Sequence, residues 1–218
     1  MSNYVIFTDS CIDLPAELAD RLALRVLPLY VTVNNSIYHN YLDERDITFK
    51  DFYQFLREHK LSQTSQVNPQ EFIDALEPIL KDGTDILSIS FSSALSGTYQ
   101  SSVIAKEELL QRYPHRKIIT IDSLCASMGQ GLLLTYAADL KKQGLSLEEL
   151  AKWVEKNKTK VCHLFTVGDL NHLKRGGRLS YAKAFIGTLL RIKPLLHVNM
   201  KGQLVQTGAT RGRSRVLT

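Results

Sequence analysis

Small hydroxyl and acidic residues stand at the ends of three segments that read as β-strands. They are Thr8-Asp9-Ser10, residues 90–93 continuing to Ser96-Gly97-Thr98, and Asp122-Ser123. In a sheet of alternating strands and helices, ligands bind beyond the carboxyl ends of the strands, where helix N-termini also point. The sequence therefore predicts a site at this edge in which hydroxyl and backbone N–H groups hold an anion.

Each of the polar motifs also has a purely structural interpretation. Gly97 lets the backbone approach a ligand, but Ser96 can equally cap the helix that follows. The Thr64-Ser65 pair precedes a proline-initiated helix, and its hydroxyls can bind a ligand or satisfy local backbone donors. Residues 174–178 combine basic side chains with two glycines, which suits an anion site or a helix C-terminus. Neither interpretation is excluded for any one motif alone.

A repeated order of strand and helix would bring these motifs to one edge of a sheet. Short β-branched runs predict strands at residues 4–8, 85–91 and 117–121, followed by helices at 15–21, 98–113 and 128–143. That alternation is typical of a parallel sheet. The other elements predicted in this part are a strand at 24–33, a helix at 48–60, a loop at Thr64-Ser65-Gln66, a helix opened by Asn68 and Pro69, and a helix at 146–157.

The charge of the chain changes sign near residue 157. Residues 158–218 carry 12 Lys or Arg and one acid, net +11, whereas residues 1–157 carry 15 basic and 21 acidic residues, net −6. We therefore expect an N-terminal α/β domain at 1–157 and the start of a second, smaller α/β domain at 158–218. Its predicted elements are a strand at 161–167, helices at 169–175 and 181–190, and a hairpin through 200–202.

Composition indicates an ordinary globular protein. With 218 residues and 44% hydrophobic content, the chain is sized for one large domain or for a domain with a smaller partner. Its start lacks the features of a secretory signal, and no apolar run approaches the ~20 residues of a membrane span. We therefore expect a cytoplasmic protein without an integral membrane segment. The three cysteines and six histidines lack the spacing of a disulfide framework or metal site.

Familiar catalytic signatures are absent from the sequence. There is no G-x-S-x-G elbow, no Walker A loop and no H-E-x-x-H, and Gly129-Gln130-Gly131 lacks the third glycine of a dinucleotide fingerprint. A nucleotide-binding or protease function therefore has little support, and we expect a ligand-binding protein rather than an enzyme. The alternatives are an enzyme that uses Asp9 and Asp122 on a small phosphorylated or carboxylated metabolite and a nucleic-acid binder that uses the basic tail. Sparse aromatic residues in that tail argue against nucleic acid.

Several motifs match one family when they are taken in chain order. They are Thr8-Asp9-Ser10 with Asp13-Leu14-Pro15, Thr64-Ser65-Gln66 ahead of Pro69, Ser92 to Tyr99, Asp122-Ser123 with Gly129 and Gly131, Asp169-Leu170 with residues 174–180, and Ile192-Lys193-Pro194 with Gly202. In this combination the chain resembles the DegV family of bacterial fatty-acid-binding proteins. The resemblance covers essentially the whole chain.

The resemblance implies a long-chain fatty acid as the bound ligand, no other cofactor, and presentation of its carboxylate to a separate fatty acid kinase. Carried onto this sequence, the carboxylate contacts are Thr64 and Ser96. Ser65, Gly97 and Thr98 shape the pocket, and Arg178 adds charge. The apolar candidates for contact with the tail are Phe185, Ile186, Leu189 and Leu190.

Members of the family usually continue beyond the point that matches Thr218 and include a His-x-Gly-Pro-Gly segment whose histidine helps to hold the carboxylate. We therefore expect the chain to be a truncated form. Its second domain would then leave sheet edges and apolar surface uncovered.

Overall fold

The computed structural model describes residues 3–58, 62–168, 173, 175–178 and 192–212. At its centre is a four-stranded parallel sheet in the order β2-β1-β6-β7. The strands are β1 (Tyr4–Asp9), β2 (Leu24–Leu27), β6 (Asp85–Ser90) and β7 (Ile118–Asp122). The predicted α/β class with alternating strands and helices is confirmed.

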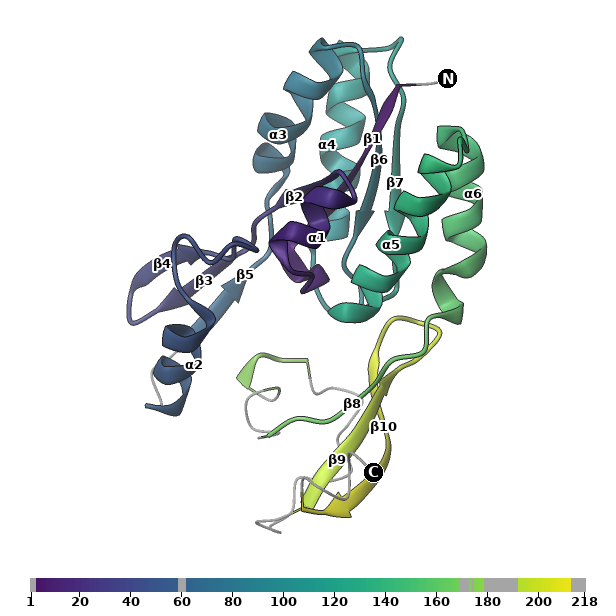
Figure 1. Ribbon diagram of the computed structural model, residues 1–218. Coiled ribbons are helices and arrows are strands. Elements are labelled where there is room, and N and C mark those ends of the chain that lie inside the picture. The colour runs from purple at the N-terminus through teal and green to yellow at the C-terminus, as the bar shows by residue number, and fades with distance from the viewer. Residues whose placement is uncertain (1–2, 59–61, 169–172, 174, 179–191, 213–218) are drawn as a thin grey trace.

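Helices cover both faces of the parallel sheet (Figure 1). One face carries α3 (Pro69–Lys81) and α4 (Thr98–Arg112), and the other carries α1 (Ala16–Arg21), α5 (Met128–Lys142) and α6 (Leu147–Asn157). Ile86 and Leu87 are adjacent on β6 and belong to opposite cores. That arrangement follows from the two-residue period of a strand, and it explains why β6 reads as a continuous apolar run.

Asn68, predicted to open this helix, caps α3 in a capping box with Glu71. The Asn68 side chain accepts a hydrogen bond from the Glu71 N–H at 3.0 Å, and the Glu71 carboxylate accepts one from the Asn68 N–H at 2.7 Å. We expect Asn68→Ala to lower the free energy of unfolding by about 1 kcal/mol, because it leaves a helix N–H unpaired. Denaturant unfolding with an unchanged m-value measures this. Asn68→Ser retains an acceptor and should stay within a few tenths of the parent, so equal loss in both variants would contradict the explanation.

A second, antiparallel sheet in the order β4-β3-β5 stands beside the parallel one. Its strands are β3 (Tyr30–Val33), β4 (Ser36–His39) and β5 (Ser62–Ser65), and α2 (Phe49–Arg57) lies between β4 and β5 in the chain. The loop predicted at Thr64-Ser65-Gln66 is therefore wrong for its first two residues, which pair with Val31 and Tyr30 of β3. The single strand predicted at 24–33 is also wrong: it breaks at Pro28, which has no N–H for a ladder.

The third sheet, in the order β10-β9-β8, is antiparallel and follows α6 in the chain. Its strands are β8 (Leu164–Phe165), β9 (Ile192–Val198) and β10 (Leu204–Arg211). The hairpin predicted through residues 200–202 is confirmed, but the strand predicted at 161–167 is limited to two residues that pair with β9. The helix predicted at 169–175 lies largely outside the described residues, and that at 181–190 lies wholly outside them.

The tip of this hairpin contacts the N-terminal part of the protein. Gly202 has a φ of 73°, and its carbonyl accepts a hydrogen bond from the Ser92 hydroxyl at 2.8 Å. A Cβ at residue 202 would lie 2.1 Å from that hydroxyl oxygen, so both the backbone angle and the close approach favour glycine. The boundary predicted after residue 157 coincides with the end of α6 and stays a prediction.

Candidate ligand-binding site

Strands β1, β6 and β7 end at the same edge of the parallel sheet, in Asp9, Ser90 and Asp122 (Figure 1). The buried Asp9 carboxylate accepts hydrogen bonds from the backbone N–H of Phe91 at 2.7 Å and of Cys11 at 3.1 Å. Burial raises the pKa of Asp9, while these hydrogen bonds act in the opposite direction. Asp9 therefore ties together the chain segments that follow β1 and β6.

Asp122 has a similar role at the end of β7. Its Oδ1 atom accepts hydrogen bonds from the N–H groups of Ser93 at 3.1 Å and Leu124 at 3.0 Å. It thereby joins the loop after β6 to the loop after β7. In this arrangement Asp9 and Asp122 shape the loops beyond the sheet, and the fully buried Asp9 has no open face toward a substrate.

A cavity of about 700 Å³ opens beyond this edge of the sheet. Its wall is formed by β5, the loops that follow β1, β6 and β7, the start of α5, and the segment around β8. The residues lining it are Cys11, Leu29, Thr64, Ser65, Gln66, Phe91, Leu95, Ser96, Ala126, Ser127, Met128, Gly129, Leu132, Val161, Cys162, His163, Leu164, Phe165, Leu173, Arg178 and Leu204. Its volume lies within the range of small-molecule sites in proteins.

Four of the six residues predicted for the site line this one cavity. They are Thr64 and Ser65 on β5, Ser96 in the loop before α4, and Arg178. Gly97 and Thr98 do not line it. The structure therefore brings Thr64 and Ser96 to a shared hollow although 31 residues separate them along the chain.

The two predicted residues that do not line the cavity lie next to residues that do. The buried Thr98 hydroxyl lies 2.9 Å from the Ser96 hydroxyl, and the Thr98 N–H donates to Ser96 at 3.3 Å. Gly97 is the N-cap of α4, and a Cβ there would lie 1.9 Å from Oε1 of Gln66. Glycine at 97 thus leaves room for the Gln66 side chain, which itself lines the cavity.

Arg178 supplies positive charge to the cavity. Its Nε donates a hydrogen bond to the carbonyl of Leu95 at 2.9 Å, and its guanidinium also contacts the carbonyl of Gly176. It forms no ion pair with an acidic side chain among the described residues. The guanidinium therefore carries a charge that an anionic ligand can neutralise.

Most of the remaining lining residues are apolar, and none of these was predicted from the sequence as part of the site. Leu29, Phe91, Leu95, Met128 and Leu132 come from three separate segments. Their residue types do not distinguish a ligand cavity from an ordinary core, so only the fold identifies them. The predicted tail contacts Phe185, Ile186, Leu189 and Leu190 lie outside the described residues. Among the described residues the cavity thus combines hydroxyls and the Arg178 cation with an apolar wall, which suits an amphipathic anion.

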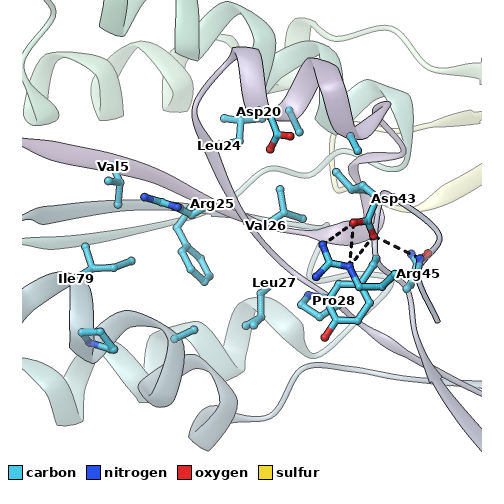
Figure 2. Close-up of a pocket in the computed structure, with 18 of the residues that line it drawn as sticks. Val5, Asp20, Leu24, Arg25, Val26, Leu27, Pro28, Asp43, Arg45 and Ile79 are labelled. Atoms are coloured by element: carbon cyan, nitrogen blue, oxygen red, sulfur yellow. Dashed lines mark hydrogen bonds and ion pairs between the residues drawn. The ribbon is translucent and has the colours of Figure 1, made fainter.

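A second cavity of about 710 Å³ lies along the edge strand β2, between α1 and α3. Figure 2 shows its apolar floor, formed by residues such as Val26 and Leu27, and the Asp43–Arg45 pair at one side. The Nε of Arg45 lies 2.8 Å from Oδ1 of Asp43. None of the residues predicted for the site lines this cavity, and its Arg45 is already neutralised.

Within the described part of the chain, no cluster of three or more His, Cys, Asp or Glu side chains could hold a metal ion. A search of the same residues for helices long and apolar enough to cross a membrane finds none.

Comparison with known proteins places the chain among closely similar sequences. A family model described as "Uncharacterised protein, DegV family" matches residues 3–218. A DegV domain-containing protein of Clostridium perfringens is 49% identical over 217 residues, which are 100% of this chain and 74% of that protein. A DegV domain-containing protein of Lactococcus lactis is 34% identical over 98% of this chain and 74% of its own length.

Solved structures show the same arrangement of elements. A fatty-acid-binding DegV family protein from Thermus thermophilus superimposes with a TM-score of 0.85 at 36% identity, over 98% of this chain and 74% of that one. A stearic acid-binding protein from Eubacterium ventriosum gives 0.89 at 28% identity, over 98% and 72%. DegV, a fatty acid binding protein from Bacillus subtilis, gives 0.82 at 33% identity, over 100% and 75%.

Proposed function

Because this chain belongs to the DegV family, we propose that it binds a long-chain fatty acid in the 700 Å³ cavity. Thr64 and Ser96 hold the carboxylate, Arg178 adds a positive charge, and Ser65, Gly97 and Thr98 shape this end of the site. The acyl chain lies along the apolar wall. Fatty acids bound by the solved relatives support this assignment.

The observation that carries the proposal is that one cavity is lined both by hydroxyls and Arg178 and by many apolar side chains. Burial of an acyl chain gains about 0.8 kcal/mol per CH₂ group, so the tail supplies most of the affinity. A buried carboxylate is costly unless hydrogen bonds and opposite charge compensate it. Hydroxyls from β5 and from the loop before α4, together with Arg178, provide that compensation.

The direct test is the identification of lipid in the purified protein. Organic extraction followed by mass spectrometry is expected to release a long-chain fatty acid in up to a stoichiometric amount. Delipidated protein should bind added fatty acid again, as measured by titration calorimetry. A protein that contains no fatty acid and binds none when it is added would overturn the proposal.

Substitution of Ser96 tests the polar end of the site. We expect Ser96→Ala to weaken fatty acid binding by roughly 1.5 to 3 kcal/mol, or about 10- to 150-fold, since it removes one hydrogen bond to a charged group. Titration of both proteins with the same fatty acid measures the change. Ser93→Ala is the matched control, because Ser93 is exposed in the same loop and does not line the cavity. Equal affinities of Ser96→Ala and the parent would remove Ser96 from the site.

The proposal extends to the fate of the bound acid. We propose a cytoplasmic carrier without catalytic activity of its own, which presents the carboxylate to a separate fatty acid kinase. The absence of a nucleotide-binding motif from the sequence supports this division of labour. Loaded protein mixed with ATP should yield acyl phosphate only after a fatty acid kinase is added. Acyl phosphate formed by the protein alone would show that it is an enzyme.

A further inference from the structure

The loop between β7 and α5 has a strained backbone and forms part of the cavity wall. Leu124 and Ser127 are not glycines, yet their φ angles are 52° and 51°. Left-handed backbone of this kind persists only where surrounding contacts hold it, and it is frequent at functional sites. Ala126, Ser127 and Met128 line the cavity. The shape of this wall therefore depends on what holds the loop.

Most of the contacts that hold this loop come from the N-terminal part of the chain. Asp122 accepts from the Leu124 N–H at 3.0 Å, and the Ser123 hydroxyl accepts from the Cys125 N–H at 3.1 Å. The Ser127 hydroxyl donates to Asp13, whose own φ is 51°. The Ala126 N–H instead donates to a residue after α6, the Nε2 atom of His163, at 3.2 Å.

The hydrogen bonds of His163 fix its protonation state. Its Nδ1 atom lies 3.1 Å from the carbonyl oxygen of Val161, which accepts only, so the proton is on Nδ1. Nε2 is then a free acceptor for the Ala126 N–H. The ring also sits against Gly129, where a Cβ would lie 1.9 Å from Nε2. Glycine at 129 is therefore required for the imidazole to reach the loop.

We propose that neutral His163 is a positioning residue of the binding cavity. Its Nε2 holds the strained β7–α5 loop through Ala126, and in this way it joins the segment around β8 to the wall contributed by α5. Protonation of Nε2 converts the acceptor into a donor that faces another donor, and this releases the loop. The effect on ligand binding rests on the proposed function, whereas the contact itself does not.

The direction of the pH effect follows from the surroundings of the ring. Burial lowers the pKa of His163, the Val161 carbonyl opposes this, and nearby His197 lowers it further. A histidine with a lowered pKa stabilises the folded arrangement of the loop above its ordinary pKa of 6.5, and this contribution is lost as pH falls through the folded-state value. Other titratable or charged groups around the ring or the loop are Cys11, Asp13, Cys125, Lys158, Cys162 and Arg178.

The test combines an acceptor-preserving variant with a pH series. We expect His163→Ala to weaken fatty acid binding about 3- to 10-fold at pH 7.5, the effect of losing one net hydrogen bond. In His163→Gln, the amide oxygen stands near the position of Nε2 and does not titrate. This variant should restore most of the affinity and should lose less of it than the parent between pH 7.5 and 5.5. Titration of the ligand carboxyl is common to all the proteins and cancels in this comparison.

His115→Gln is the control for histidine titration in general, because His115 is exposed in the loop between α4 and β7 and does not line the cavity. It should keep a pH-dependent loss of affinity. If His163→Gln matched His163→Ala at pH 7.5, or kept the parent's pH dependence, the positioning role would be wrong.

Nuclear magnetic resonance of the ligand-free protein separates this inference from the proposed function. The Ala126 amide shift should titrate together with the His163 ring in the parent and should not titrate in His163→Gln. If this holds while no fatty acid binds, the contact stands and the proposed function fails. If fatty acid binds but the Ala126 amide does not follow the His163 ring, the inference fails alone.

Discussion

Leu132→Glu is expected to abolish fatty acid binding, with a loss of about 4 kcal/mol or about 1000-fold in affinity. Leu132 lies on α5 and contributes to the apolar wall of the cavity. An acyl chain packed against this position would strip water from the new carboxylate and offer it no hydrogen bond in return. The substitution also places a negative charge in the same cavity as the ligand carboxylate. Both effects oppose binding without any change in the polar end of the site.

The matched control for this prediction is Ile104→Glu. The two parent side chains are almost equally exposed, at 46% for Leu132 and 44% for Ile104, and both lie on helices that cover the parallel sheet. Ile104 does not line the cavity. Thermal unfolding should therefore change similarly in the two variants, whereas calorimetry with a long-chain fatty acid should detect binding only in Ile104→Glu. Binding of near-parental strength by Leu132→Glu would place the acyl chain elsewhere.

The parallel sheet was predictable because its signals are local. Asn68 and Ser146 cap helices through hydrogen bonds to residues three positions along, and these patterns are visible in the sequence. The apolar runs of β6 and β7 require burial on both faces, which only a sheet between two helical layers provides. The parallel order of the strands then brings their hydroxyl-rich ends to the same edge of the sheet.

The antiparallel sheet beside it was not predictable in the same way. β5 consists of Ser62, Gln63, Thr64 and Ser65, a sequence without apolar alternation. It is extended because it pairs with β3, so tertiary context sets its conformation. The same pairing places Thr64 at the cavity, which explains how a residue pair assigned to a loop still belongs to the predicted site.

The polar and apolar parts of the candidate site differ in how far sequence can find them. Thr64, Ser96 and Arg178 belong to motifs whose order along the chain is distinctive, and all three line one cavity. Leu164 and Phe165 approach that cavity from a two-residue strand far along the chain, and nothing in their type separates them from core residues. His163 was read from sequence as one of several isolated histidines, because its partner Ala126 is identified only by the fold.

We expect Asp9→Ala to lower the free energy of unfolding by about 4 kcal/mol at acidic pH. The substitution leaves the N–H groups of Phe91 and Cys11 without their side-chain acceptor, and each unpaired donor costs about 1–3 kcal/mol. Gln130 also loses a contact with Asp9, at 3.5 Å. Because the loops after β1 and β6 form part of the cavity wall, the variant should also bind fatty acid more weakly. Equilibrium unfolding in denaturant measures the first effect.

The pH dependence of this loss distinguishes Asp9 from an ordinary carboxylate. Burial raises the pKa of Asp9 above 3.8, so the folded protein binds its proton more tightly than the unfolded chain. The parent therefore loses stability as pH rises from about 3.8 through the folded-state pKa, and Asp9→Ala lacks this decline. The stability difference between the two proteins should shrink from pH 4 to pH 7.

Asp122 is the control for the role of burial. It also accepts hydrogen bonds from two backbone N–H groups, but it is only partly buried, so water can replace it. Asp122→Ala should cost about 1 kcal/mol, and an equal loss in both variants would mean that burial is not what makes Asp9 important.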